Sequence, residues 1–275
     1  MNSSVYEDIK KAKRIVIKVG TSTLTYPTGK MHIKHIDELA RTLSDLHNSG
    51  KDIVLVSSGA VGAAMGKMGI SERPKETNIK QALAAIGQCE LMYLYDKLFS
   101  EYHNTVAQVL LTKDDISIPD RKTNTQSTFN TLLDMGIIPI VNENDTVSTE
   151  ELEIGDNDNL SALVADLVDA DLLVLFSDID GLYDADPHTN PDAKIIPIVA
   201  DIDSVSASAG GAGTNRGTGG MITKLEAARK VTDANINMII ANGNNISALY
   251  DILDGNKIGT LFVSKKNQQY IKEMS

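Results

Sequence analysis

The segment RIVIKVG at residues 14–20 decides the fold of this 275-residue chain. It is a short β-branched run that ends in glycine, and apolar residues at helical spacing follow it from His32 to Asn48. A second strand-like run, DIVLVSS, occupies residues 52–58. Gly50 stands where a left-handed residue would end the intervening helix. This order predicts a βαβ unit and hence a parallel sheet.

The same alternation continues along the chain and predicts a three-layer α/β/α sandwich with an open, mainly parallel sheet. Ligands of such sheets bind beyond the carboxyl ends of the strands, so functional residues are expected where strands end. We expect two lobes, residues 1–170 and 171–275, that meet near Ala170 and share one continuous sheet, with no separate accessory domain. The Gly-, Ser- and Ala-rich segment from Ser204 to Gly220 is predicted to be a loop. Further strands are predicted at 105–111, 137–141, 171–176, 236–241 and 260–263, and helices at 78–101, 121–135, 158–168, 221–234 and 246–253.

Composition excludes several classes of protein. The formal net charge of −11, with no dense basic run, argues against a nucleic-acid partner. No apolar run approaches the roughly 20 residues that cross a bilayer, so we expect a cytoplasmic protein without a membrane partner. The single cysteine, Cys89, lies in the apolar pattern ALAAIGQCELM and is predicted to be a core residue of a helix rather than a nucleophile.

The first two predicted strands end in residues suited to anions. Lys18 interrupts the apolar run IVIKV, and a lysine within a buried strand implies an anionic partner; the alternative is an exposed lysine beside a turn. After the second strand comes SSGAVGAAMG, where Ser58 and Gly59 precede a helix whose amino end could hold an anion. Small residues at this place are equally compatible with tight helix packing.

Two further segments place clusters of polar residues after strands. IIPIVNENDTVS supplies Asn142, Glu143, Asn144 and Asp145, which could grip the ammonium group of an amino acid or could simply form a capped turn. In GDNDNLSALVADL, residues 156–159 precede an apolar helical stripe. Helix capping explains one of those four polar residues, not all of them.

The last two segments suit a nucleotide better than a metal ion. The acidic loop SDIDGLYDADP has Gly181 fourth from Asp178, whereas an EF-hand needs glycine at the sixth position. GTGGMITKLEAARK places glycines before a helix and Lys224 one turn inside it, where amides and an ammonium can share phosphate oxygens. A flexible hinge before an ordinary helix is the alternative. Neither a Walker A motif nor a dinucleotide fingerprint is present in this segment.

Taken in order, six segments resemble the amino acid kinase family: IVIKVGTS, LVSSGAVGAA, PIVNENDTVS, GDNDNLSALVA, FSDIDGLYDADP and GTGGMITKLEAA. NENDTVS followed by GDNDNLSAL resembles the branch that phosphorylates the side-chain carboxylate of L-glutamate with ATP, the first step of proline biosynthesis. The alternatives are another enzyme of this fold, acting on acetylglutamate, carbamate or a nucleotide monophosphate, and a non-catalytic nucleotide sensor.

The resemblance implies a role for each matching residue. Lys18 and Lys224 would contact the phosphates during transfer, and Asp158 would hold both lysines in place. The substrate-binding residues would be Ser58, Asp145 and Asn157, with Asn142 and Glu143 lining the same pocket. The nucleotide-binding residues would be Lys18, Ser177, Asp178, Thr218, Gly219, Gly220, Met221, Ile222, Thr223 and Lys224.

The resemblance also implies ligands and partners. They are ATP, Mg²⁺ held mainly through the ATP phosphates, L-glutamate, proline as a feedback inhibitor, a glutamyl phosphate reductase that receives the product, and a homo-oligomer. Two departures accompany it: a carboxyl-terminal RNA-binding-type domain found in many relatives is not expected here, and Gln126 stands in DRKTNTQSTF where relatives carry a basic residue. The second departure bears on proline inhibition rather than on catalysis.

Overall fold

The computed structural model describes residues 3–26, 28–148, 156–187, 189–209 and 220–272. The chain forms two compact units: unit 1 contains Met1–Lys18 and Asp158–Ser275, and unit 2 contains Val19–Asn157. The first strand therefore belongs with the carboxyl-terminal part of the chain. These compact units are not divided near Ala170, and the assignment of residues 1–170 and 171–275 to two functional lobes stays a prediction.

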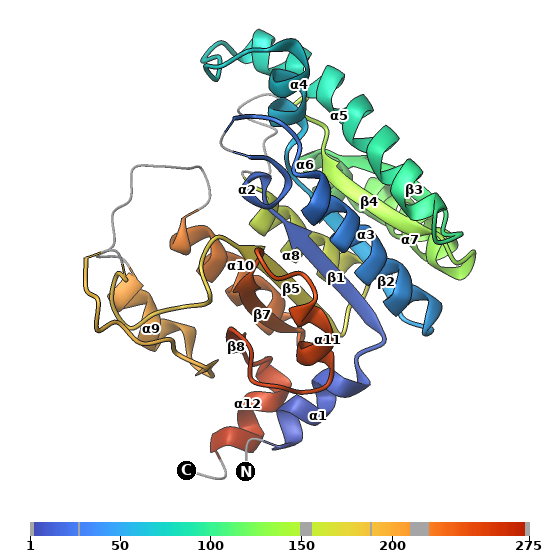
Figure 1. Ribbon diagram of the computed structural model, residues 1–275. Helices are drawn as coiled ribbons and strands as arrows, with labels where there is room; N and C mark the ends of the chain where they lie inside the picture. The colour runs from blue at the N-terminus through green and yellow to red at the C-terminus, as the bar shows by residue number, and fades with distance from the viewer. Residues whose placement is uncertain (1–2, 27, 149–155, 188, 210–219, 273–275) are drawn as a thin grey trace. The chain divides into compact units, whose positions relative to one another are not determined.

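Unit 2 is built on a parallel sheet. Its strand order is β3-β4-β2, and β4 pairs in parallel with both neighbours. Helices α3, α5 and α7 pack against β2, β3 and β4 respectively, and Figure 1 shows α4 and α5 lying side by side. Its elements are α2 (Thr21–Leu24), α3 (Ile33–Asn48), β2 (Asp52–Ser57), α4 (Ala60–Met68), α5 (Thr77–Ser100), β3 (Val106–Leu111), α6 (Lys113–Ser117), α7 (Pro119–Asp134) and β4 (Ile138–Glu143).

Unit 1 contains the remaining strands in the order β1-β5-β7-β8-β6. β5 and β7 are parallel, β8 runs antiparallel to β7, and β6 is parallel to β8. Helix α1 packs against α11, and α10 packs against β7 and α9 (Figure 1). The elements are α1 (Ser3–Lys11), β1 (Arg14–Val19), α8 (Asn157–Leu167), β5 (Leu172–Ser177), β6 (Ile198–Val199), α9 (Ile202–Ala209), α10 (Met221–Asp233), β7 (Asn237–Asn242), α11 (Ala248–Leu253), β8 (Thr260–Phe262) and α12 (Lys265–Lys272).

Continuous apolar strands form the core of each unit, as expected for sheets covered on both faces. Ile53 to Val56 of β2 are fully buried, and so are Leu172 to Phe176 of β5. The mainly parallel α/β architecture predicted from the strand and helix alternation is confirmed. Within the described part of the chain, no helix is both long and apolar enough to cross a membrane.

Two local predictions are wrong. Residues 204–209, predicted as loop, belong to α9, because Asp201 Oδ1 accepts a hydrogen bond from the Asp203 backbone at 3.0 Å and caps the start of the helix. The remainder of that segment up to residue 219 lies outside the described residues. Cys89, predicted as a core residue, is exposed on α5. Apolar residues occur all around this helix, so their presence near Cys89 did not identify its buried side.

Candidate active site

A buried group of three charged side chains lies in unit 1. Lys18 Nζ is 2.6 Å from Asp158 Oδ1, and Lys224 Nζ is 3.0 Å from Asp158 Oδ2. Lys18 is 8% exposed, Lys224 is 5% exposed and Asp158 is 1% exposed. We call this group the ion triad. The anionic partner that the interrupted strand predicted for Lys18 is therefore present.

The fold positions each member of the ion triad at the end of an element. Lys18 lies near the carboxyl end of β1, Asp158 lies in the first turn of α8, and Lys224 lies in the first turn of α10. Thr223 Oγ1 also donates to Asp158 Oδ2 at 3.1 Å, so one carboxylate connects three elements. Two positive charges and one negative charge leave one positive charge in excess, which favours an anion nearby.

The surroundings of Asp158 favour the ionised form of its carboxylate. Burial acts to raise the pKa of Asp158, but the positive charges and hydrogen bonds of Lys18 and Lys224 outweigh it and hold the pKa below its usual value. Both carboxylate oxygens are engaged by ammonium groups, one each. With a lowered pKa and both oxygens taken by ammonium groups, Asp158 is not suited to act as a general base.

A chain of neutral hydrogen bonds lies in unit 2. Asn157 Nδ2 donates to Ser58 Oγ at 2.8 Å and to Asn142 Oδ1 at 2.9 Å. Asn142 Nδ2 in turn donates to Gln88 Oε1 at 3.0 Å. We call Ser58, Asn157, Asn142 and Gln88 the amide chain. Three of its members were predicted from the sequence, and the structure brings them together.

Small residues bring α4 and α5 close enough to support the amide chain. Gly59, at the start of α4, has a φ of 101°, a conformation that side-chain-bearing residues rarely adopt. A Cβ on Gly87 would lie 1.6 Å from the carbonyl oxygen of Ala60, so only glycine permits this helix contact. The next residue of α5 is Gln88, a member of the amide chain. The small residues of SSGAVGAAMG thus serve tight helix packing, the alternative considered from sequence, while Ser58 joins the polar network.

The remaining predicted substrate residues follow β4. Glu143 is 7% exposed, and its Oε1 accepts a hydrogen bond from Ser148 Oγ at 3.2 Å. The backbone carbonyl of Ser148 accepts from Gln81 Nε2 at 3.0 Å, which ties the turn to α5. Asp145 is half-buried in this turn. The segment is thus a hydrogen-bonded turn, as one of the two alternatives predicted, and a role in binding the ammonium group of an amino acid stays a prediction.

The predicted nucleotide residues of unit 1 occupy the carboxyl end of β5. Ser177 Oγ donates to Asp178 Oδ1 at 3.0 Å, and Ser177 pairs in register with Asn242 at the end of β7. Asn242 Nδ2 donates to Asp180 Oδ1 at 2.6 Å. Sequence reasoning missed Asn242, although its place at the end of a predicted strand marked it. It also missed Gln88, which stands inside a helical pattern where nothing distinguishes it.

Helix α10 begins at Met221 with its amino end accessible. Gly220 is exposed, Ile222 is 60% exposed, and the Gly220 carbonyl oxygen, 2.8 Å from Thr223 Oγ1, is the alternative acceptor to Asp158 for the one hydroxyl proton of Thr223. Free backbone N–H groups at the start of a helix suit phosphate oxygens. The predicted residues Thr218 and Gly219 lie outside the described residues. Among the residues that are described, no group of three or more His, Cys, Asp and Glu side chains could hold a metal ion.

Comparisons with known proteins agree on one family. The sequence model described as "Amino acid kinase family" matches residues 13–242. The chain is 54% identical over 265 residues to a protein of Clostridium perfringens named glutamate 5-kinase, covering 94% of this chain and 98% of the relative. A protein of Listeria monocytogenes with the same name is 51% identical over 267 residues, covering 95% and 97%. A longer relative with that name, from Caldanaerobacter subterraneus, is covered over 68% of its length.

Solved structures show the same fold at low sequence identity. A carbamate kinase from Giardia lamblia, bound to AMP-PNP, superposes with a TM-score of 0.68 at 18% identity, covering 93% of this chain and 100% of that chain. A UMP kinase from Bacillus anthracis gives a TM-score of 0.65 at 16% identity, covering 92% and 97%. At these identities the likeness concerns the fold alone.

Proposed function

The chain belongs to the amino acid kinase family, and from that premise we propose how its site residues carry out the reaction. The chain transfers the γ-phosphoryl group of ATP to the side-chain carboxylate of L-glutamate and produces L-glutamyl 5-phosphate. The observation that carries phosphoryl transfer is the buried ion triad, with its excess positive charge. The choice of glutamate is supported by curated relatives at 51–54% identity over nearly their whole length.

Phosphoryl transfer asks for alignment and charge stabilisation more than for covalent chemistry. An oxygen of the glutamate side-chain carboxylate attacks the γ-phosphorus, the bond to the oxygen that bridges the β- and γ-phosphates breaks, and ADP leaves. A glutamate side chain with a pKa of about 4.3 is already deprotonated at neutral pH, so no general base is needed. This suits the ion triad, because its carboxylate, Asp158, is already paired with two lysines and is not available as a base.

We assign the residues of unit 1 to the phosphate groups. Lys18 and Lys224 stabilise the negative charge on the transferred phosphoryl oxygens, and Asp158 keeps both ammonium groups in place. Ser177, Asp178 and the segment from Thr218 to Lys224 bind the nucleotide. The accessible amino end of α10 supports this role for its first residues. Magnesium enters as part of the MgATP substrate, coordinated mainly by the phosphates.

We assign the residues of unit 2 to glutamate. Ser58 and Asn157 offer hydrogen-bonding groups for its carboxylates, and Asp145 attracts its ammonium group. Asn142 and Glu143 line the same pocket. An acidic residue at position 145 disfavours acceptors that lack an ammonium group, such as N-acetylglutamate.

A parallel acceptor assay tests the function. ADP release is measured with L-glutamate, L-aspartate, N-acetylglutamate, carbamate and UMP, using the wild type, Lys224→Ala and Lys257→Ala. Lys257 is an exposed lysine of the same unit and serves as the matched control. We expect glutamate-dependent ADP release that survives Lys257→Ala and is lost in Lys224→Ala. Preference for N-acetylglutamate would contradict the assignment, and the absence of acceptor-dependent ADP release with every acceptor would favour a non-catalytic nucleotide sensor.

The product's chemistry supports a partner. An acyl phosphate is a reactive mixed anhydride, so we propose a cytoplasmic handover to a reductase that consumes it in proline biosynthesis. Flux through both enzymes would then exceed the rate set by free diffusion when the reductase is added. Equal rates with and without a competing trap for the free acyl phosphate would support the handover. Inhibition by proline and homo-oligomerisation remain predictions, which initial rates with added proline and sedimentation velocity would test.

A further inference from the structure

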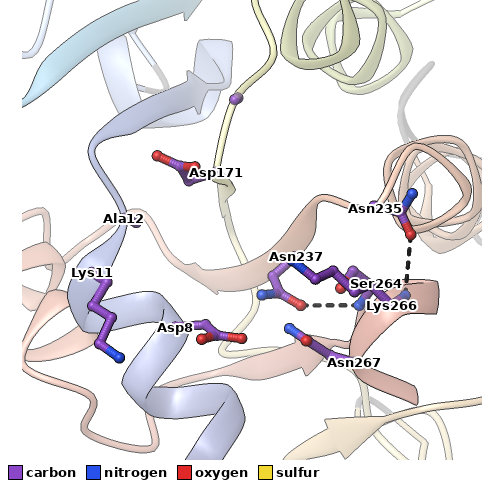
Figure 2. A pocket seen from close by; sticks show the side chains of 10 residues that line it. Asp8, Lys11, Ala12, Asp171, Asn235, Asn237, Ser264, Lys266 and Asn267 are labelled. Atoms are coloured by element: carbon purple, nitrogen blue, oxygen red, sulfur yellow. Dashed lines mark hydrogen bonds between the residues drawn. The ribbon is translucent and has the colours of Figure 1, made fainter. Parts of the chain in front are cut away.

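Unit 1 has a cavity at the opposite edge of its sheet from the ion triad. It has a volume of about 260 Å³ and lies among α1, the start of β5, the start of β7 and the segment after β8 (Figure 2). Pockets for drug-sized ligands have volumes of roughly 300–1,000 Å³, so this cavity suits a smaller molecule. The residues that matter for its chemistry are Asp8, Lys11, Asp171, Asn237, Ser264 and Asn267.

The cavity is separate from the proposed nucleotide site. Asp171 precedes β5, whereas Ser177 ends it; Asn237 begins β7, whereas Asn242 ends it. A strand rises by about 3.3 Å per residue, so the two edges are roughly 17 Å apart along β5. A molecule bound in the cavity would therefore not occupy the place of ATP.

The floor of the cavity is polar and buried. Asn237, Ser264 and Asn267 are 5%, 1% and 5% exposed. Asn237 Oδ1 accepts a hydrogen bond from the Ser264 backbone at 2.9 Å, which fixes its amide. Among the described residues, Asn237 Nδ2, the Ser264 hydroxyl and the Asn267 side-chain amide have no protein partner. These three groups are not sealed from solvent but open into the cavity, so they can donate or accept hydrogen bonds with a polar ligand.

Charges of both signs surround that floor. Asp8 and Lys11 come from α1, and Figure 2 shows the Asp8 carboxylate on the same side of the cavity as Asn237 and Asn267. Asp171 lies above them, held by its Oδ2, which accepts from the backbones of Lys13 at 2.7 Å and Arg14 at 2.8 Å. A phosphate-like anion would meet Lys11 and Lys266 but also two carboxylates, so the lining does not favour an anion alone. A metal cation would lack ligands, since no metal-binding cluster occurs in the described ranges.

We propose that this cavity binds a free α-amino acid with a short polar side chain. Its ammonium group pairs with Asp8. Its carboxylate accepts hydrogen bonds from the floor, with Lys11 supplying positive charge, and its side chain is directed toward Asp171. Both signs of charge and the unpaired floor groups are then used by one zwitterion. The site is independent of the proposed glutamate-binding residues, which belong to unit 2.

Ligand-observed NMR with L-serine, L-threonine and L-asparagine tests the proposal, in the presence of saturating L-glutamate. Matched probes are ethanolamine, which lacks the carboxylate of serine, and 3-hydroxypropionate, which lacks its ammonium group. We expect saturable binding of at least one of the three amino acids and at least about tenfold weaker binding of both single-charge probes, a loss equivalent to one strong interaction.

Variants of α1 complete the test without disturbing the buried floor. Asp8→Asn removes an exposed charge that lines the cavity, and Glu7→Gln removes an exposed charge of the same helix that does not. We expect about tenfold weaker amino acid binding in Asp8→Asn and unchanged binding in Glu7→Gln. Failure of all three amino acids to bind, displacement by glutamate, or equal binding by both variants would overturn the proposal.

Discussion

The ion triad of unit 1 is buried and the amide chain of unit 2 is half-buried, and the two sets are held together by different forces. In the ion triad, two ammonium groups share one carboxylate, and the attraction compensates the cost of removing three charges from water. In the amide chain, neutral donors and acceptors pass hydrogen bonds from Ser58 to Gln88. Consecutive residues, Asn157 and Asp158, belong to the two sets.

The difference between these two sets matches what each has to recognise. A phosphoryl group in transfer carries negative charge, and positively charged side chains stabilise it. A small amino acid must instead be distinguished from close analogues, and hydrogen bonds of fixed geometry discriminate better than charge alone. We therefore expect damage to the ion triad to reduce turnover and stability, and damage to the amide chain to change mainly the affinity for glutamate.

The largest effect is expected from Asp158→Asn, which keeps the shape of the side chain and removes its charge. Two buried lysines then face each other without a counter-ion, and breaking a buried ion pair costs about 3–5 kcal/mol of unfolding free energy. Urea denaturation at pH 7 measures the loss, with Asp166→Asn on the exposed side of the same helix as control. A loss of no more than the control would show that the ion triad is not needed for folding.

Lowering the pH is a second test of how the ion triad contributes to stability. The pKa of Asp158 is held below its usual value, so the carboxylate contributes stability above the unfolded pKa and loses it as pH falls through the folded pKa. The wild type should therefore destabilise below about pH 4 more steeply than Asp158→Asn. Parallel slopes for the two proteins would contradict a lowered pKa of Asp158.

The next effect is expected in catalysis from Lys18→Met, which retains the length of the side chain without its charge. Asp158 keeps Lys224 as partner, so the fold is retained, but one donor to the transferred phosphoryl group is lost. By analogy with an oxyanion donor, turnover should fall by about 10²- to 10³-fold, roughly 3–4 kcal/mol in the barrier. Steady-state rates at saturating ATP and glutamate measure it. A change confined to the KM for ATP would assign Lys18 to binding alone.

Much of the fold was predictable because its strands are continuous apolar runs that end in glycine or polar residues. β6 was missed, since two residues beside Pro197 carry no periodic pattern. Helix α1 was missed although Val5, Tyr6 and Ile9 bury one of its faces. The position of Cys89 could not be predicted, because Ile86 and Tyr93 of the same helix are also exposed and blur its apolar periodicity.

The two sets of site residues were predictable to different degrees. Lys18 was indicated by charge within an apolar strand, an anomaly that its ion pair with Asp158 explains. The pairing of Asp158 with Lys224 joins residues far apart in sequence, and only resemblance to a family suggested it. Gln88 of the amide chain lies on a helix rather than after a strand, so the rule that places ligands at carboxyl ends of strands did not reach it.

A smaller effect is expected from Asn142→Ala in the amide chain. The substitution removes one hydrogen-bond partner from Gln88 Oε1 and one from Asn157 Nδ2. Both side chains are half-buried, so the expected loss of unfolding free energy is about 1 kcal/mol, the lower end of the cost of leaving a buried polar group unsatisfied. The KM for glutamate should rise while the KM for ATP stays unchanged. Gln108→Ala, an exposed amide residue of the same sheet, is the control. An equal rise in both KM values would mean that the amide chain serves the whole site and not the amino acid.

The smallest effect is expected from a histidine of unit 2 that lies outside both site sets. The His32 ring stacks on Tyr26 and on His35, with centroids 4.0 Å and 3.7 Å apart, and it accepts a hydrogen bond from the His35 backbone at the start of α3. Burial, followed by the charge of His35, lowers the pKa of His32. The folded protein thus favours the neutral ring.

His32→Asn tests that preference, because asparagine can still cap α3. Where a base has a lowered pKa in the fold, the unfolded chain binds the proton first, so stability is complete above about pH 6.5 and falls as the solution becomes more acidic. The melting temperature of the wild type should fall between neutral and mildly acidic pH, and that of His32→Asn should fall by less. His103→Asn is the control, since asparagine tolerates its φ of 59°. If both variants follow the wild-type pH dependence, protonation of His32 does not govern the stability of the protein between neutral and mildly acidic pH, and other titrating groups cause the loss.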